Sequence, residues 1–409
     1  MLGAGPAGLA AALALVRAGA HVRLVEAGPT VGGLCVTTRR DDFSFDLGGH
    51  ILFVHTPARE AWLRELLGAD LIRVGRPVAC VSDGGIRPGR YFDQAGPLAS
   101  RPPRPPGPEL SAEDYLSAVM PPGAAFQAAR RYMEKVDGVP MDVITGIRCH
   151  RLFTEQYAPD GWLYPAGGVG QLMDAMARAV GAGGGEIRIG NRVESVTTSD
   201  DRVTGVRVTD AGGVTTTLQA DAVVAGIPPA LTLRLLDGAP PPPDFPARAA
   251  AVVALAIDAP RVSDEPWIQV DDPSVPFSRL AEPRNWSARL APPDRTALTC
   301  EVYCSPASSD PWWPLPDEEL AEGCRDGLVH LGLLPAGTSV RSLAVIRRPR
   351  AWSIVPVGRV EEMQEATAHL AAISGLVSAQ GGDVIQAVDA GEEAALAALR
   401  EIGAGVGGR

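Results

Sequence analysis

The chain has 409 residues, of which 46% are hydrophobic and 21% are charged, and its formal net charge is −11. This length exceeds one ordinary hydrophobic core, and the composition excludes a disordered or fibrous chain. An acidic protein with a pI near 5.1 is unsuited to sequence-independent binding of nucleic acid or anionic membranes. We therefore expect no nucleic-acid partner.

The remaining composition favours a cytoplasmic enzyme. The longest apolar run, residues 249–257, is nine residues long and too short to span a bilayer. The first residues lack the basic region of a secretory signal. Six cysteines without a CxxC pair indicate neither a disulfide framework nor a metal site.

The first fifty residues carry the most information. Gly3, Gly5 and Gly8 form a G-x-G-x-x-G pattern, residues 9–18 predict a buried helix, and residues 21–26 predict a buried strand. In a dinucleotide-binding fold the first glycine permits a tight turn, and the second lets the backbone approach a pyrophosphate. The third lets the helix pack closely on a strand.

The predicted strand ends in Glu26, eighteen residues beyond Gly8. A carboxylate there accepts hydrogen bonds from both ribose hydroxyls and would repel a 2′-phosphate. The bland alternative is a glycine turn before a helix, with Glu26 merely solvated. The order of glycines, helix, strand and carboxylate favours a dinucleotide site.

Only Met1 and Leu2 precede Gly3, whereas this fold requires a buried strand at that place. We expect either that upstream residues complete the strand or that the central strand is short. In both cases the sheet lacks ladder hydrogen bonds, so adding about five apolar residues should improve expression and cofactor retention.

The rest of the chain alternates helical and strand-like segments. A Pro- and Arg-rich stretch over 86–108 predicts a surface excursion, and residues 186–224 predict a three- or four-stranded meander that ends in a buried strand. A proline-dense linker at 239–246 precedes a second β-rich region that runs to about residue 302. Further helices are expected at 111–135, 168–180, 317–331, 359–371 and from about 386.

Several segments together resemble the flavin amine oxidase superfamily: VEAGPTVGGLCVTT, FSFDLGGH, YMEKVDGVP, WLYPAGGVGQL and GGDVIQAVDAGEEAA. The resemblance spans nearly the whole chain and is greatest to protoporphyrinogen-oxidase-like and UDP-galactopyranose-mutase-like proteins. It implies an α/β fold, with a Rossmann-type FAD-binding domain (parallel sheet plus β-meander) and an inserted mixed α+β substrate domain. The FAD domain would comprise residues 1–75, 181–235 and 345–409, and the substrate domain residues 76–180 and 236–344.

The resemblance also implies FAD as the cofactor and assigns parts of it to particular residues. The pyrophosphate would lie on Gly3, Gly5 and Gly8, and the adenosine ribose on Glu26. Gly32 and Gly33 would line the path of the pyrophosphate and the ribityl chain, and Gly48 and Gly49 would lie against the flavin ring. The other implied contacts are Val193, Asp383 and Val384. Among these, Val193 would bracket the adenine. The main chain of Asp383 and Val384 would face the flavin N1/C2 edge, where a helix N-terminus stabilises a reduced, anionic ring. For Gly48 and Gly49 the alternative is a simple turn.

Three departures from the family pattern argue against a simple amine oxidase activity and against a sugar mutase activity. The single lysine, Lys135, lies in a predicted helix, so the lysine that amine oxidases place near the flavin has no counterpart. Asp383 stands where monoamine oxidases have an aromatic-cage tyrosine. The tyrosine-bearing segment of the mutases reads AWSIV over residues 351–355.

Two residues are candidates for catalysis. His50 follows the double glycine and could act as an acid or base, or it could only position the backbone. Arg279 could hold a substrate carboxylate or phosphate, or it could be a solvated strand arginine. Tyr164 and Trp352 could form aromatic walls beside the flavin or belong to the core. Glu301 could point inward or outward from its strand.

These features together predict an FAD-dependent oxidoreductase of the amine oxidase type. It would transfer a hydride from a small organic substrate to flavin N5, by C–N or C–C desaturation, in a biosynthetic pathway. Oxygen would be one candidate acceptor for the electrons. The alternatives are a non-redox flavin mutase acting on a nucleotide sugar, and a degenerate FAD-binding protein without catalysis.

Overall fold

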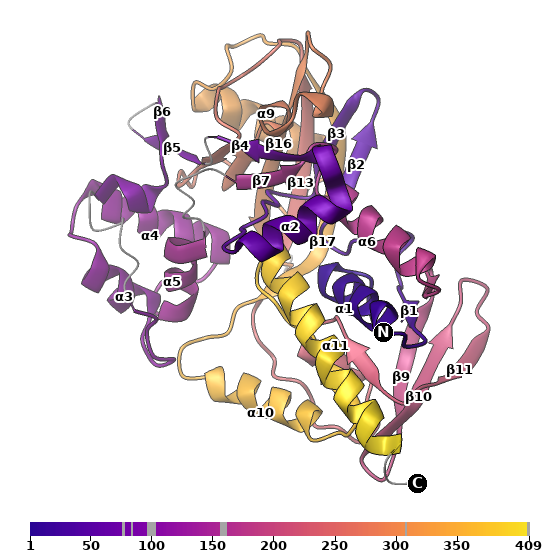
Figure 1. Ribbon diagram of the computed structural model, residues 1–409. Helices are drawn as coiled ribbons and strands as arrows, with labels where there is room; N and C mark the ends of the chain where they lie inside the picture. Colours follow the sequence, from indigo (N-terminus) through magenta and orange to yellow (C-terminus); the bar gives the residue numbers. More distant parts are fainter. Residues whose placement is uncertain (76–77, 83–84, 96–103, 156–161, 307–308, 407–409) are drawn as a thin grey trace.

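The computed structural model describes residues 1–75, 78–82, 85–95, 104–155, 162–306 and 309–406 (Figure 1). Its helices are α1 (Pro6–Arg17), α2 (Pro57–Leu67), α3 (Ala112–Val119), α4 (Ala124–Asp137), α5 (Gly146–Glu155), α6 (Gly170–Ala182), α7 (Pro229–Arg234), α8 (Pro283–Trp286), α9 (Asp317–His330), α10 (Val360–Ala371) and α11 (Val384–Val406). In this described part of the chain, no helix is both long and apolar enough for a membrane crossing.

The strands form one large sheet, a small parallel sheet, a meander and two antiparallel pairs, β2–β3 and β4–β7. They are β1 (Arg23–Val25), β2 (Thr37–Arg40), β3 (Phe43–Asp46), β4 (Leu71–Val74), β5 (Ala79–Ser82), β6 (Gly85–Pro88), β7 (Trp162–Pro165), β8 (Glu186–Arg188), β9 (Arg192–Ser199), β10 (Arg202–Thr209), β11 (Thr215–Gln219), β12 (Val223–Ala225), β13 (Ala247–Ile257), β14 (Trp267–Gln269), β15 (Arg279–Ala281), β16 (Thr296–Cys304), β17 (Val340–Ser353) and β18 (Leu376–Ser378). The surface excursion expected over 86–108 lies partly outside the described residues.

A small parallel sheet lies around Leu2. β1 pairs with β8, and β12 pairs with β18, in both cases in parallel. Leu2 forms parallel bridges to Val25 of β1 and to Ala225 of β12, and it thereby joins the two pairs. The side chain of Leu2 is buried between them.

Helix α1 begins at Pro6, because proline at a first helical position lacks only an N–H that the helix would leave unpaired. The Ala- and Leu-rich sequence that follows is almost wholly buried against α6 and α11. Helix α11 runs alongside α1 (Figure 1) and approaches it closely at Gly391. A Cβ atom at Gly391 would lie 2.2 Å from the carbonyl oxygen of Ala7, so this contact requires glycine.

The predicted meander is present as three antiparallel strands, β9, β10 and β11, and the chain then enters the buried strand β12, as predicted. The segment EIRIG differs from the prediction, because β8 pairs in parallel with β1 instead of joining the meander. The reason is topological: β8 follows α6, and a strand that returns through a helix joins its sheet in parallel.

The large sheet has seven strands in the order β17-β13-β16-β15-β14-β5-β6. Its core is formed by alternate residues of β13 and β16 together with helix α9. Strand β17 lies at the edge, and Pro349 falls within an irregularity of its pairing with β13. An edge strand tolerates proline there because the missing N–H costs no central ladder bond. Helices α3, α4 and α5 pack into a separate cluster beside this sheet.

The packing of α6 and β17 differs from the domain boundaries expected from the sequence. Helix α6 shares its core with α1 and α11, although residues before 181 are expected in the substrate domain. Strand β17 pairs along β13 of the large sheet, although residues from 345 onward are expected in the FAD domain. We therefore propose boundaries before Gly170 and after Ser353.

Candidate functional site

The start of α1 forms an open cradle. Gly3 has φ +83°, and a Cβ atom at Gly8 would lie 1.9 Å from the carbonyl oxygen of Gly3. A Cβ atom at Gly5 would meet nothing within 4 Å. No side chain in the described part of the protein caps α1. Gly8 is therefore required by packing, whereas Gly5 leaves space at a helix N-terminus, where phosphate groups bind.

The carboxylate of Glu26 lies over this cradle. It accepts hydrogen bonds from the backbone N–H of Ala4 at 2.8 Å and of Gly28 at 2.6 Å. A carboxylate has about four acceptor positions, so Glu26 retains capacity for ribose hydroxyls. The backbone of Glu26 also accepts from Asn191 at 2.9 Å, which brings the start of β9, with Val193, to the same end of the cradle.

A second glycine turn lies against the first. The N–H of Gly32 donates to the carbonyl of Ala4 at 2.8 Å, and a Cβ atom at Gly33 would lie 3.3 Å from the Cα of Gly5. Both Gly32 and Gly33 have positive φ angles, +112° and +61°. The backbone of these two glycine turns, with open space at Gly5, fits the diphosphate of a dinucleotide.

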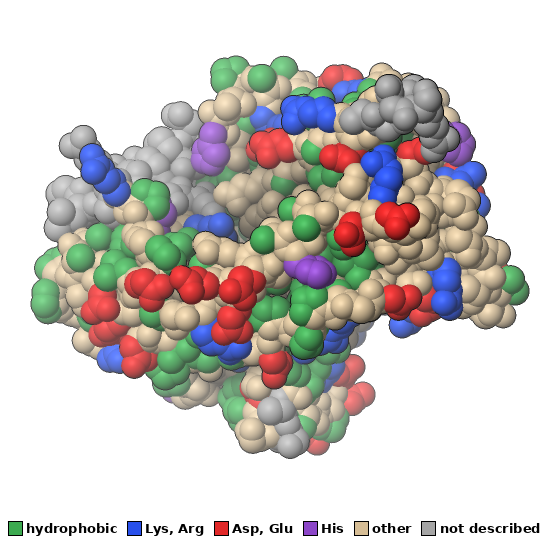
Figure 2. All heavy atoms as spheres, turned by 90° about the horizontal axis from the view of Figure 1, so that it is seen from below, with side chains coloured by type: hydrophobic (Ala, Val, Ile, Leu, Met, Phe, Trp, Pro, Cys, Tyr) green, Lys and Arg blue, Asp and Glu red, His purple; other side chains and the backbone are tan. Residues whose placement is uncertain are grey.

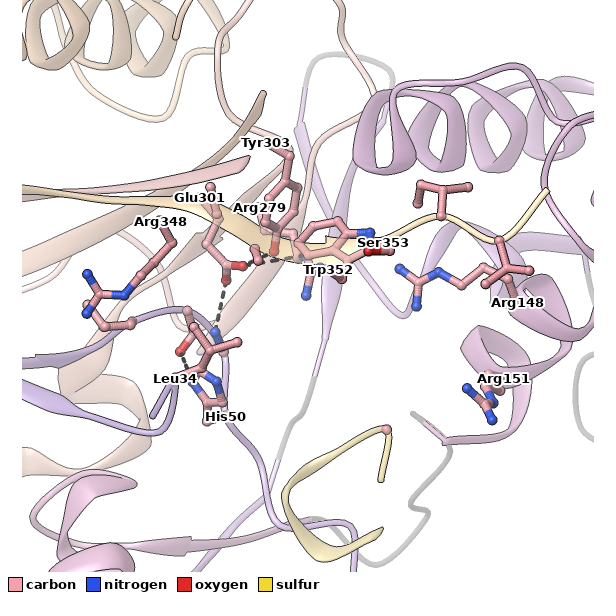
Figure 3. Close-up of a pocket in the computed structure, with 18 of the residues that line it drawn as sticks. Leu34, His50, Arg148, Arg151, Arg279, Glu301, Tyr303, Arg348, Trp352 and Ser353 are labelled. Carbon is pink, nitrogen blue, oxygen red and sulfur yellow. Dashed lines mark hydrogen bonds and ion pairs between the residues drawn. The ribbon is translucent and has the colours of Figure 1, made fainter. Parts of the chain in front are cut away.

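A cavity of about 700 Å³ lies where the turn Gly48–His50 faces β16 and β17 (Figure 3). Helix α5 and the turn before α11 close other sides of the cavity. Its charged, polar and aromatic lining consists of His50, Thr145, Arg148, Arg151, Arg279, Glu301, Tyr303, Arg348, Trp352 and Ser353.

Glu301 of β16 points into this cavity, so the inward alternative is the correct one. Its carboxylate accepts a hydrogen bond from the N–H of Gly49 at 2.9 Å and another from the hydroxyl of Tyr303. Burial raises the pKa of Tyr303 well above its ordinary value, Arg279 lowers it and Glu301 raises it further. The Tyr303 hydroxyl therefore stays protonated and remains a donor.

Arg279 of β15 lies on the same wall. Its guanidinium carbon is 5.3 Å from the ring centroid of Trp267 and 4.9 Å from that of Tyr303, and its Nε is 3.8 Å from Glu301. Burial acts to lower the pKa of Arg279, but Tyr303, Tyr132 and Glu301 outweigh it and raise the pKa. The side chain is thus a fixed positive charge held between two rings and a carboxylate.

His50 also lines the cavity. Its Nδ1 lies 3.1 Å from the carbonyl oxygen of Gly48 (Figure 3). This contact fits a role in holding the turn, while the imidazole still borders the cavity.

Three further arginines line the cavity and were not singled out from the sequence. Arg148 and Arg151 lie on α5, three residues apart, and Arg348 lies on β17. Trp352, a predicted substrate residue, borders the cavity with its ring edge-on to Tyr303, at 4.8 Å between centroids. The spacing of Arg148 and Arg151 was the available signal, because residues three apart share a helix face.

Two other predicted residues lie outside the described lining of the large cavity. Tyr164 is buried, donates its hydroxyl to Asp46 at 2.6 Å and is absent from the described lining of the large cavity. Asp383 caps α11 by accepting from the N–H groups of Ile385 and Gln386. Gly381 and Gly382, which precede it, border the cavity instead.

Lys135 lies apart from this lining. Its ammonium group donates to the backbone carbonyls of Asp272 and Phe277, each at 2.6 Å. Burial lowers the pKa of Lys135 to about 8, and the charges of Asp272 and Asp271 oppose that shift. The amine is thus committed to two structural contacts.

Comparisons with known proteins agree with this geometry. Residues 2–66 match the NAD(P)-binding Rossmann-like domain, and residues 110–344, more than half of the chain, match the family described as flavin containing amine oxidoreductase. No curated protein sequence matches the chain significantly.

Solved structures similar to the chain share its fold. Reduced UDP-galactopyranose mutase is 19% identical with a TM-score of 0.76, covering 98% of this chain and 94% of that one. A protein from Exiguobacterium assigned as a protoporphyrinogen oxidase is 18% identical with a TM-score of 0.72, covering 97% of each chain. Putrescine oxidase bound to putrescine is 18% identical with a TM-score of 0.69, covering 98% of each.

The predicted α/β fold with a Rossmann-type domain and the predicted FAD cofactor are therefore confirmed. The family model includes most of the strands and helices that surround the cavity. The chain belongs to the flavin-containing amine oxidoreductase family, and its cofactor is FAD.

Proposed function

We propose that the protein is an oxidoreductase that removes a hydride from a small organic substrate bearing a carboxylate or phosphate, at a C–N or C–C bond. Bound FAD would supply the two-electron acceptor for this reaction. The observation that carries the proposal is the cavity at the turn Gly48–His50, whose described lining includes four arginines and one carboxylate.

The cradle at α1 is the proposed cofactor site. The diphosphate would lie on the backbone at the start of α1, the ribose at Glu26, and the flavin ring at the turn beside the cavity. The proposed contacts are Gly3, Gly5, Gly8, Glu26, Gly32, Gly33, Gly48, Gly49, Val193, Asp383 and Val384, joined by Gly381 and Gly382.

The charge of the cavity supports an anionic substrate. The four arginines of the lining would repel an amine that carries only positive charge: Arg148, Arg151, Arg279 and Arg348. A guanidinium group pairs well with a carboxylate or a phosphate. Acidic and basic side chains are interspersed over the face drawn in Figure 2, whereas the described cavity lining has four arginines and one carboxylate.

Each proposed substrate contact follows from this arrangement. Arg279 would hold the anionic group, because Glu301 and two aromatic rings already fix its guanidinium. The rings of Trp352 and Tyr303 would form the apolar wall for the rest of the substrate. His50 would exchange a proton with the substrate or hold the turn, and Tyr164 is left out of the proposed substrate site.

A nucleotide-sugar mutase is the second candidate. Closely placed arginines also suit a diphosphate, and the fold is shared with UDP-galactopyranose mutase. A protein that binds FAD without catalysis is the third.

Anaerobic mixing of the FAD-loaded protein with a panel of amino acids, hydroxy acids and phosphorylated amines distinguishes these candidates. The proposal predicts that one substrate class removes the visible absorbance of the oxidised flavin, and that Arg279→Met weakens its binding. Admission of air then tests oxygen as the acceptor. Turnover of UDP-galactopyranose only after chemical reduction would establish the mutase, and no reaction with either would favour the third candidate.

A further inference from the structure

A buried carboxylate behind the cavity contacts two of the residues that line it. Asp137, the last residue of α4, is 0% exposed and does not belong to the described lining. Its Oδ1 accepts from Nη2 of Arg148 at 3.2 Å and from Nε1 of Trp352 at 3.3 Å, and its Oδ2 accepts from Nε of Arg148 at 3.3 Å. The carboxylate of Asp137 thus accepts hydrogen bonds from both the guanidinium group of Arg148 and the indole ring of Trp352.

The location of Asp137 is unfavourable for stability alone. The C-terminal end of a helix carries partial negative charge, so a carboxylate there is repelled, and burial adds a desolvation cost. A residue that served only to fill the core would be apolar at this position. The charge of Asp137 therefore indicates a role in holding its two partners.

The end of α4 is itself fixed to the large sheet. Arg248 of β13 donates to the carbonyls of Val136 at 3.1 Å and Lys135 at 3.2 Å. Gly138 ends the helix with φ +68°, in the left-handed region that favours glycine, and a Cβ atom there would lie 2.1 Å from Nη1 of Arg248. Asp137 consequently projects from a rigid platform.

The two partners come from separate segments. Arg148 lies on α5 and is 33% exposed, and Trp352 lies on the edge strand β17. A long arginine side chain at such a place loses rotamer freedom when it binds a ligand. An acceptor that fixes Arg148 beforehand removes that cost, and the shared acceptor sets the spacing between its charge and the Trp352 ring.

We propose that Asp137 is a positioning residue that fixes Arg148 and Trp352 as the substrate-recognition wall of the cavity. The wall suits a flat or aromatic group on Trp352 with a carboxylate beside Arg148. This inference rests on the proposed function, because it concerns the same cavity, but it is tested by binding without turnover.

The test uses the FAD-loaded full chain and benzoate, followed by flavin absorbance and tryptophan fluorescence. Asp137→Asn should raise the Kd for benzoate about tenfold, and Arg148→Met should raise it at least as much. The losses in the double variant should be less than additive, because Asp137 acts mainly through Arg148 and only its bond to Trp352 remains to be lost. Asp93→Asn is the matched control, since Asp93 holds Arg90 in a similar ion pair away from the cavity lining.

Two milder variants cover the case in which Asp137→Asn fails to fold. Trp352→Phe keeps an aromatic ring but removes the Nε1 hydrogen bond, and Arg148→Lys keeps the charge but loses the paired contact with Asp137. Each should weaken benzoate binding about two- to fivefold, while thermal unfolding is lowered by only a few degrees.

Several outcomes would overturn the inference. They are a benzoate Kd unchanged in Asp137→Asn or in both milder variants, additive losses in the double variant, or an equal loss in Asp93→Asn. A wild-type holoenzyme that does not bind benzoate would also overturn it. The oxidoreductase proposal is separate, because it stands or falls on anaerobic reduction of the flavin.

Discussion

The carboxylate of Glu301 accepts a hydrogen bond from the backbone N–H of Gly49 at 2.9 Å, across 252 residues of sequence. A Cβ atom at Gly48, which has φ +107°, would lie 3.2 Å from Oε2 of Glu301. The Glu301 side chain of strand β16 therefore lies so close to the turn that a residue larger than glycine at position 48 would crowd it. This carboxylate joins the large sheet to the turn of the proposed flavin site.

Removing the Glu301 carboxylate should destabilise the protein. Glu301→Ala leaves the N–H of Gly49 and the hydroxyl of Tyr303 without this acceptor and the buried charge of Arg279 without its carboxylate, so we expect a loss of about 3–5 kcal/mol in the free energy of unfolding. Glu301→Gln retains an acceptor for Gly49 and should lose less. Chemical denaturation measures both, and an alanine variant as stable as the wild type would contradict the assigned contacts.

Two glycines of the cradle should respond differently to alanine. At Gly8 the new Cβ would lie 1.9 Å from a backbone oxygen, so Gly8→Ala should cost about 3 kcal/mol or more of folding stability. At Gly5 the space is open, so Gly5→Ala should leave the apoprotein within about 1 kcal/mol of the wild type.

The same Gly5→Ala variant should bind FAD at least tenfold more weakly, because its methyl group occupies the space proposed for the diphosphate. Thermal unfolding of the apoprotein and titration with FAD separate the two effects. Unchanged FAD affinity in Gly5→Ala would place the diphosphate elsewhere.

Asp46 should give the stability a pH dependence. Burial raises the pKa of Asp46, while hydrogen bonds from Thr37 and Tyr164 lower it, with burial the larger effect. The folded state therefore holds the Asp46 proton more tightly than the unfolded state does. This contribution to stability is fully present below the ordinary carboxyl pKa of about 4 and is lost as pH rises through the folded pKa.

The side chain in Asp46→Asn resembles the neutral acid but does not titrate. This variant should therefore lose the contribution of Asp46 to the change of the free energy of unfolding with pH. The free energy of unfolding of both proteins, measured between about pH 4 and 7, checks it. Identical slopes would show that Asp46 is ionised in the folded protein across this range.

Asp383 should influence the reduction potential of the bound flavin. Its side chain caps α11 beside Gly382, and asparagine caps helices as well as aspartate does. Asp383→Asn should therefore preserve stability, remove one negative charge near the helix start, and raise the two-electron midpoint potential by about 10–20 mV. A spectroelectrochemical titration measures this shift, and an unchanged or lower potential would contradict the proposed place of the ring.

Local patterns in the sequence predicted the first part of the fold. The glycines before α1, the buried strand that ends at Glu26, and the meander β9–β11 all follow from short-range spacing. Edge strand β17 was not anticipated, because Pro349 and several arginines interrupt its apolar alternation. Only its pairing with β13 makes it a strand.

The walls of the cavity were harder to predict, because they are assembled from distant segments. Arg279 and Trp352 border the cavity, as one of the alternatives stated for each expected, but Arg348 does so through tertiary packing that no local pattern encodes. Tyr164 was a candidate for the cavity wall but lies in the core. Its hydroxyl donates to Asp46, as the hydroxyl of a buried tyrosine usually has a hydrogen-bond partner.

A crystal structure of the protein with FAD tests the central claim most directly. The account predicts that the diphosphate lies on the backbone beside Gly5 and that the flavin ring lies against Gly48 and Gly49, facing Arg279 across the cavity. Density for FAD that leaves the cradle empty, or that directs the ring away from this cavity, would contradict it.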